Sequence, residues 1–190
     1  MRTAFKEWAV IVDALERGDQ IVILRKGGIH EGRGGFQPEH RSFWLFPTLF
    51  HQQRESVLAP AQQRFDALAP FLSKDKVRIG SFAEVVDCRR IESLHAAESL
   101  KGQHVWIDEV IAQRFEWGRE KNIFAIAVRV FRLAKPVEVP VLPIYGGCKS
   151  WIELEVPLKT DDAIRVLPEP GFTTRLNQFR AALDGVPVTH

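Results

Sequence analysis

Hydrophobic residues recur at helical spacing near the start of the chain. Between Thr3 and Gly18 they fall three or four positions apart, the repeat that one face of a helix buries. Thr3 can cap the first turn, and Gly18 suits the left-handed position that ends a helix. The pattern predicts a helix over residues 3–18 whose buried face carries Phe5, Trp8, Ile11, Val12 and Leu15.

Two short strands are predicted next. Residues 20–25 form a largely apolar run that leads into a basic turn, Arg-Lys-Gly-Gly, at residues 25–28. The glycines of that turn let the backbone approach a ligand closely. Residues 32–40 are polar and rich in glycine, which predicts a loop. Residues 42–46 predict a second strand that Pro47 halts, because proline cannot donate to a strand ladder.

The middle of the chain predicts helical segments followed by a long strand. Apolar residues between positions 51 and 72 are spaced as in helices, and we expect breaks at Pro60 and Pro70. Residues 77–91 alternate between apolar and polar, which predicts a strand, and Gly80 permits a bend or bulge within it.

A helix and a strand are expected after that. Residues 105–116 have helical spacing, and Gly118 can end the helix. Residues 122–132 are rich in apolar and β-branched side chains and predict a strand, which we expect Pro136 to close.

The C-terminal part completes the fold prediction. Residues 150–156 predict a strand and residues 172–183 an amphipathic helix. Strands in succession, with N-terminal, central and C-terminal helices, predict an α+β fold with a small mixed sheet or small β-barrel. We expect a single domain over residues 1–190, with a barrel-like core over about 1–158 and a C-terminal extension and helix over 159–190.

Composition excludes several classes of protein. The chain has 190 residues with 26 Lys+Arg and 24 Asp+Glu, so its net charge of +2 predicts no broadly basic surface. No apolar run approaches the roughly 20 residues of a membrane span, and the start lacks a signal peptide, so we expect a cytoplasmic protein without a membrane partner. Cys88 and Cys148 are too few for a disulfide framework or a cysteine-rich zinc site, and no metal or other cofactor is expected.

The basic turn is the first candidate binding site. Arg25 and Lys26 supply cationic donors next to open backbone amides, a combination that suits a phosphate or carboxylate. Alternatively, Arg25 closes the barrel through an internal ion pair. His51 and Gln52 follow the next strand and can read a base edge or move a proton. A structural histidine and a helix cap are the alternatives for these two residues.

A second candidate lies in the later glycine motif. Gly146 and Gly147 give access, Lys149 gives charge, and Trp151 can either stack on a base or sugar or belong to the core. Cys148 beside Lys149 is also a candidate nucleophile, for which His51 would be the base.

These motifs carry a resemblance to known families. Residues 4–8, 24–28, 46–48, 51–52 and 146–151 together resemble a bacterial family, domain of unknown function 1802. The resemblance extends over most of the chain and implies no established activity.

A more distant similarity is to ASCH domains, which are PUA-like β-barrels associated with RNA. Their turn has the pattern Gly-x-Lys-x-x-Glu-x-Arg, of which this chain keeps Gly18 and Arg25. Gln20 replaces the lysine and Ile23 the glutamate. The small amidohydrolases of that superfamily depend on these two residues, so the resemblance implies the fold and RNA binding and counts against that chemistry.

The preferred hypothesis is a nucleic-acid or nucleotide-binding module with a PUA-like core. Its partner would be RNA, single-stranded DNA or a nucleotide. One alternative is a hydrolase that uses Cys148 or an acid/base pair centred on His51. Another is a protein-interaction domain or homodimer, which would expose an apolar patch of Phe36, Phe43 or Trp44. The ligand-binding residues of the preferred hypothesis are Arg25, Lys26, His51, Gln52, Lys149 and Trp151.

Overall fold

The computed structural model describes residues 1–26, 40–48, 53–71, 73–147 and 149–185. Its strands are β1 (Thr3–Trp8), β2 (Val22–Arg25), β3 (Ser42–Thr48), β4 (Lys76–Ile91), β5 (Ile123–Pro140), β6 (Trp151–Glu153) and β7 (Ile164–Arg165). Its α-helices are α1 (Ala9–Arg17), α2 (Ala59–Leu68), α3 (Leu94–Glu98), α4 (Asp108–Glu116) and α5 (Glu169–Asp184). Short 3-10 helices cover Arg54–Ser56, Ala69–Phe71 and Pro143–Tyr145.

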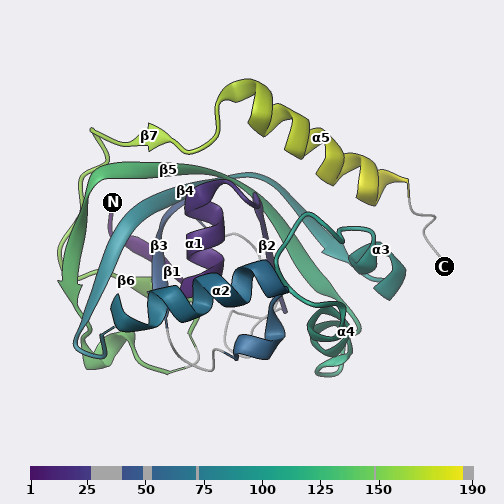
Figure 1. Cartoon of the computed structure of the whole chain (residues 1–190), viewed down its shortest axis with the longest axis horizontal. Helices are drawn as coiled ribbons and strands as arrows, with labels where there is room; N and C mark the ends of the chain where they lie inside the picture. Colours follow the sequence, from purple (N-terminus) through teal and green to yellow (C-terminus); the bar gives the residue numbers. More distant parts are fainter. Residues whose placement is uncertain (27–39, 49–52, 72, 148, 186–190) are drawn as a thin grey trace.

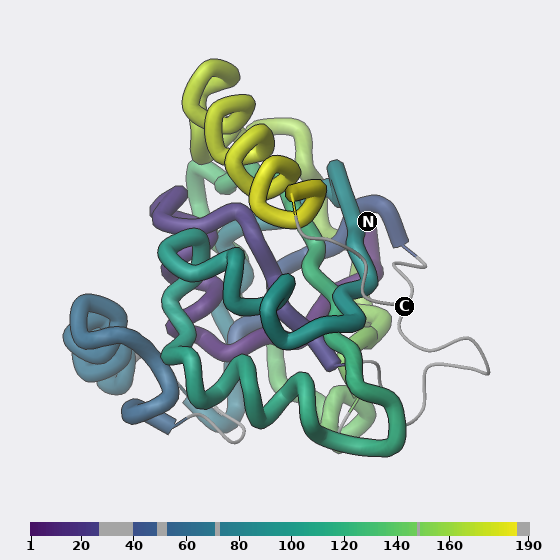
Figure 2. The backbone as a smooth tube through the Cα atoms, turned by 90° about the vertical axis from the view of Figure 1, so that its right-hand side faces the viewer, coloured from purple at the N-terminus to yellow at the C-terminus, as the bar shows by residue number. Residues whose placement is uncertain are grey.

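The strands form one curled mixed sheet. Their order is β2-β5-β4-β3-β1-β6, with β7 paired to β5. The β1–β3 pair is parallel and the other pairs are antiparallel. Figure 1 shows the sheet arching around α1, and in Figures 1 and 2 helices α5 and α2 lie on opposite sides of the β4–β5 arch. This arrangement confirms the predicted α+β fold with a mixed sheet and N-terminal, central and C-terminal helices.

The prediction of a helix from residue 3 was wrong for its first half. Residues 3–8 form β1, and α1 begins only at Ala9. In β1, Phe5 is paired with Leu45 on one side and Trp151 on the other, so partners distant in sequence override the local helical spacing. The predicted end is confirmed, because Gly18 adopts the left-handed conformation with φ 73°.

The long strand β4 confirms the predicted bend at Gly80. Its register with β5 shifts between Ile79 and Ser81, where residues 133–136 of β5 bulge opposite the glycine. Pro136 falls in this bulge and does not close the strand as predicted, so β5 continues to Pro140.

Pro47 likewise does not halt β3, which continues to Thr48. Pairing with β4 ends at Trp44, so β1 is the one described strand that lies beside β3 at the proline. A proline is tolerated in a strand that has lost one neighbour, because a ladder hydrogen bond on that side is no longer needed.

The helix predictions are largely confirmed. Pro60 lies in the first turn of α2 and does not break it, and Pro70 lies in the 3-10 turn that follows. Helix α4 begins three residues later than predicted, at Asp108, and Gly118 follows its end with φ 83°. The C-terminal helix is confirmed as α5, which buries Phe172, Leu176 and Phe179.

Candidate functional site

Arg25 connects the two edges of the curled sheet. It is the last residue of β2, at one edge, and its Nη2 donates a hydrogen bond of 2.5 Å to Oγ of Ser150. Ser150 directly precedes β6, at the other edge. The guanidinium also lies over the ring of Phe5 in β1, 5.1 Å from its centroid. Among the described residues, no backbone ladder joins these two edges, and the side chain of Arg25 links them.

A buried carboxylate accompanies this arginine. Glu7 is 1% exposed, and its Oε2 lies 3.7 Å from Nη1 of Arg25. Its Oε1 accepts a hydrogen bond of 2.8 Å from the backbone N–H of Trp8. The internal ion pair that the sequence left as the alternative for Arg25 is thus present in the fold.

A second arginine, Arg114 of α4, lies close to Arg25 and Glu7. Its Nη1 donates a hydrogen bond of 3.0 Å to the carbonyl of Leu24, and its guanidinium lies 3.8 Å from the ring centroid of Trp106. Burial lowers the pKa of Arg114 to about 10, Glu7 acts to raise it and Arg25 to lower it further. We call Glu7, Arg25, Arg114 and Ser150 the edge cluster. It contains two guanidinium groups and one carboxylate.

Trp151 packs beside the edge cluster. Its ring centroid lies 4.8 Å from that of Phe5, the same ring that Arg25 covers. Phe43 and His40 contact it edge-on, at 5.0 and 5.1 Å. Trp151 and His40 remain half-buried. The fold therefore brings Trp151 and Arg25, two of the predicted binding residues, to one aromatic group.

Lys26 has internal partners. Its Nζ donates to the carbonyls of Phe115, Glu120 and Asn122, at 3.2 Å for Phe115 and 2.8 Å for Asn122. Burial lowers the pKa of this amine. Lys26 thus holds the end of α4 against the start of β5.

Of the remaining predicted site residues, one is exposed and the others lie outside the described residues. Lys149 is exposed and lies one residue before Ser150. His51, Gln52 and Cys148 lie outside the described residues, so the proposed pairing of Cys148 with His51 stays a prediction.

Two of the three residues named for the apolar patch of an interaction domain are buried. Phe43 is 1% exposed and Trp44 is fully buried, because both lie in the central strand β3. Phe36 lies outside the described residues.

Two further observations concern the described part of the chain. Its helices include none with the length and apolar character that crossing a bilayer requires. It contains no cluster of three His, Cys, Asp or Glu side chains placed to hold a metal ion.

Glu7, Arg114 and Ser150 were not among the binding residues predicted from the sequence. Reading residues 3–8 as a strand would have placed Phe5 and Glu7 on one face, because side chains two apart in a strand point the same way. Both of them contact Arg25. Arg114 lies in a predicted amphipathic helix, and its spacing does not distinguish it from a solvated arginine.

Comparison with known proteins identifies one family. The pattern of the family described as Domain of unknown function (DUF1802) matches residues 4–178. No curated protein matches the chain significantly.

Similar solved structures include ASCH from Zymomonas mobilis. Crystal structures of this protein and of two single-residue variants, one tyrosine-to-phenylalanine and one serine-to-alanine, each cover 92% of the chain. The matches cover 92–95% of those chains at 12–13% identity, with TM-scores of 0.41 to 0.46. At these values no residue role is transferred from them.

Proposed function

The chain belongs to the DUF1802 family, a domain of unknown function, so we propose a function from its site. We propose that the protein is a nucleic-acid or nucleotide-binding module. In this proposal the edge cluster receives a phosphate group, and Trp151 and His40 lie beside the base or sugar. RNA, single-stranded DNA or a free nucleotide would supply that phosphate.

The observation that carries the proposal is the unequal charge of the edge cluster. Among the described residues, Glu7 is the one carboxylate that acts on both Arg25 and Arg114; Glu7 is buried, and the two arginines are half-buried. A buried charge without a counterion is costly, so an arriving anion is stabilised there. The planar fork of an arginine matches the paired oxygens of a phosphate.

The surroundings favour a nucleotide over a bare anion. Trp151 and His40 contact each other edge-on, and both residues are half-buried, so each keeps part of its surface exposed. Bases stack on such rings, with a contribution of roughly 1–3 kcal/mol per base. Lys149, exposed next to Ser150, can reach a following phosphate. The net charge of +2 favours one or a few nucleotides over a long duplex.

Fluorescence anisotropy with a labelled single-stranded RNA of about six nucleotides tests the proposal, with DNA of the same sequence and mononucleotides as competitors. We expect binding that weakens as salt is raised, because phosphate contacts release counterions. Arg25→Lys keeps the positive charge but removes the planar guanidinium that can bind two phosphate oxygens at once, so it should weaken binding about tenfold.

The matched control is Arg119→Ala, which removes an exposed arginine in the turn after α4. This control should change the affinity by less than about twofold. Lys149→Ala is a separate test: it should lower the slope of log affinity against log salt by the amount expected for about one lost phosphate contact. Absence of binding at low salt, or an equal loss in Arg119→Ala, would refute the proposal.

A further inference from the structure

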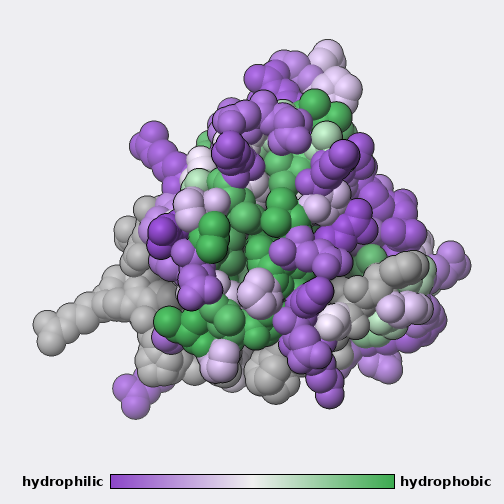
Figure 3. Space-filling view, turned by 90° about the vertical axis from the view of Figure 1, so that its left-hand side faces the viewer, coloured by the Kyte–Doolittle hydropathy of each residue, from purple (hydrophilic) through white to green (hydrophobic). Residues whose placement is uncertain are grey.

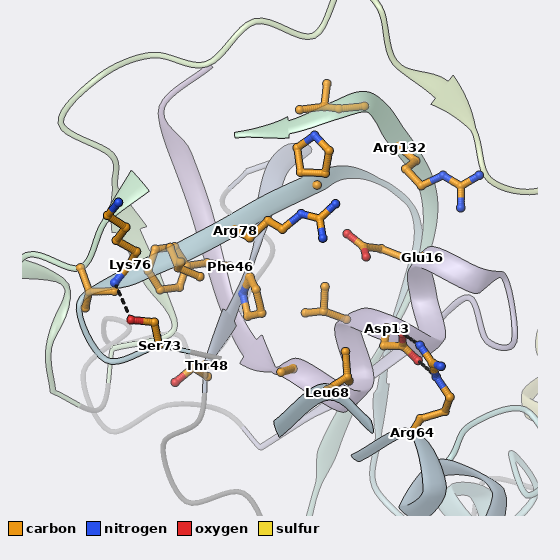
Figure 4. Close-up of a pocket in the computed structure, with 18 of the residues that line it drawn as sticks. Asp13, Glu16, Phe46, Thr48, Arg64, Leu68, Ser73, Lys76, Arg78 and Arg132 are labelled. Atoms are coloured by element: carbon orange, nitrogen blue, oxygen red, sulfur yellow. Dashed lines mark hydrogen bonds and ion pairs between the residues drawn. The ribbon is translucent and has the colours of Figure 1, made fainter. Parts of the chain in front are cut away.

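A cavity that is separate from the edge cluster lies beside α1. Its volume is about 760 Å³, which is in the range of small-molecule sites. It is lined by α1, α2, the end of β3, the start of β4 and the bulge of β5, as Figure 4 shows. The edge-cluster residues do not line it.

The wall of this cavity presents mostly apolar surface. Val12 of α1, Val77 of β4 and Leu133 of β5 are buried beside it. The wall reaches the surface at Val141 and Ile164, which are 37% and 61% exposed. Figure 3 shows this end of the molecule, where apolar surface is bordered by charged groups. An apolar chain can therefore enter the cavity from solvent.

Cationic side chains surround the aliphatic wall. Five of the lining residues are basic and two are acidic. Arg64 is neutralised by Asp13, to which it donates two hydrogen bonds of 2.6 and 3.0 Å. The lining cations are Arg64, Lys74, Lys76, Arg78 and Arg132.

Unlike Arg64, neither Arg78 nor Arg132 has an ion-pair partner among the described residues. Figure 4 shows the guanidinium of Arg78 beside the carboxyl group of Glu16 and that of Arg132 farther away; this carboxyl group accepts a hydrogen bond of 2.7 Å from Ser81. Within the described residues, neither guanidinium has a hydrogen bond or an ion pair closer than 4 Å. The charges of two exposed arginines thus act on one carboxylate, whose pKa burial raises.

The wall chemistry discriminates between anionic ligands. Phe46 is the one aromatic residue in the described lining; it is 4% exposed and lies edge-on to Tyr145. It offers a base little stacking surface, whereas the valine and leucine side chains suit an alkyl chain. We propose that this cavity binds an amphipathic anion, with its aliphatic body along the wall and its carboxylate or phosphate head at Arg78 and Arg132.

Calorimetric titration of the full chain tests this with three probes of one chain length: octanoate, octyl phosphate and 1-octanol. The anions should bind at least about tenfold more tightly than the alcohol, because charge-assisted hydrogen bonds add to the same apolar burial. Preference for octanoate or octyl phosphate identifies the head group. Arg78→Ala and Arg132→Ala should each weaken anion binding about tenfold.

Two further variants control the result. Arg119→Ala removes an arginine remote from the lining and should change nothing. Ala134→Trp fills the cavity from its β5 side and should abolish binding of all three probes, while circular dichroism reports whether the fold is kept.

The proposal is overturned if neither anion binds or if octanol binds as tightly as the anions. It is also overturned if Arg119→Ala weakens anion binding as much as Arg78→Ala does. Arg25→Lys should leave octanoate binding unchanged, so this site and the edge cluster are tested independently.

Discussion

Nη2 of Arg25 lies 2.5 Å from Oγ of Ser150, across 125 residues of sequence. This hydrogen bond links β2 and β6, the two edge strands of the sheet. Because the same guanidinium neutralises the buried Glu7, one side chain satisfies two groups that the curled sheet brings together.

Replacing this arginine should destabilise the fold as well as the site. Arg25→Ala leaves Glu7 buried without its ion-pair partner and removes the bond to Ser150, so we expect the free energy of unfolding to fall by about 2–4 kcal/mol. Urea denaturation followed by tryptophan fluorescence measures it. Ser150→Ala removes the hydroxyl alone and should cost about 1 kcal/mol. Equal stability of Arg25→Ala and wild type would show that the edges need no side-chain link.

Lys26 should be a stability determinant. Its Nζ satisfies the carbonyls of Phe115, Glu120 and Asn122, which Lys26→Met would leave without this donor. We expect a loss of about 1–2 kcal/mol, measured by urea denaturation. Lys121→Met is the matched control, because Lys121 is exposed and pairs with the exposed Glu116, and it should cost less than about 0.5 kcal/mol. A larger loss in the control would contradict this assignment.

Buried His104 should make the protein less stable in mild acid. Burial lowers its pKa to about 4 from 6.5, although Asp108 acts to raise it, and its Nδ1 has no hydrogen-bond partner in the described structure. Between these values the unfolded chain binds a proton that the folded chain does not. The free energy of unfolding therefore falls as pH drops, by about 2 kcal/mol between about pH 7 and pH 5.

The comparison with His104→Gln isolates this histidine. The variant should lose that part of the pH dependence in urea denaturation at the two pH values. Burial raises the pKa of Glu16, which acts in the opposite direction because the folded state then binds its proton more tightly. Identical pH slopes in wild type and His104→Gln would rule the histidine out.

The packing of helix α5 against the rest of the protein should depend on Phe179. This ring is fully buried, so Phe179→Ala should destabilise the protein by about 3–5 kcal/mol. If α5 separates before the rest unfolds, limited proteolysis will cut near residues 159–168 in the variant first. Gln178→Ala, on the exposed side of the same helix, is the control and should stay within about 0.5 kcal/mol. A small loss in Phe179→Ala would mean that ion pairs such as Arg129–Glu169 hold the helix.

Local patterns predicted several elements well, and their errors have one cause. The bend of β4 at Gly80 and the end of α1 at Gly18 follow from conformations that glycine allows, which are properties of the residue itself. Residues 3–8 have helical spacing but pair with β3 and β6. Pro47 and Pro136 lie within strands because pairing changes beside them.

The candidate site was predictable only in part. Arg25 was identified because it follows a strand and precedes glycines, and Trp151 because it follows a glycine motif. Their meeting at Phe5 depends on β1 lying beside β6. The cavity beside Arg78 was missed because its lining comes from segments spread between Ala9 and Ile164.

The sequence by itself determined the α+β class, the helix ends at glycines, the long bent strand and the position of a basic strand end, since these depend on residue type and short-range spacing. Tertiary structure alone decided that Arg25 faces Glu7 and Ser150 and that Arg78 and Arg132 face Glu16. The physical reason is that burial and charge balance depend on neighbours through space, which strand order sets and local periodicity does not encode.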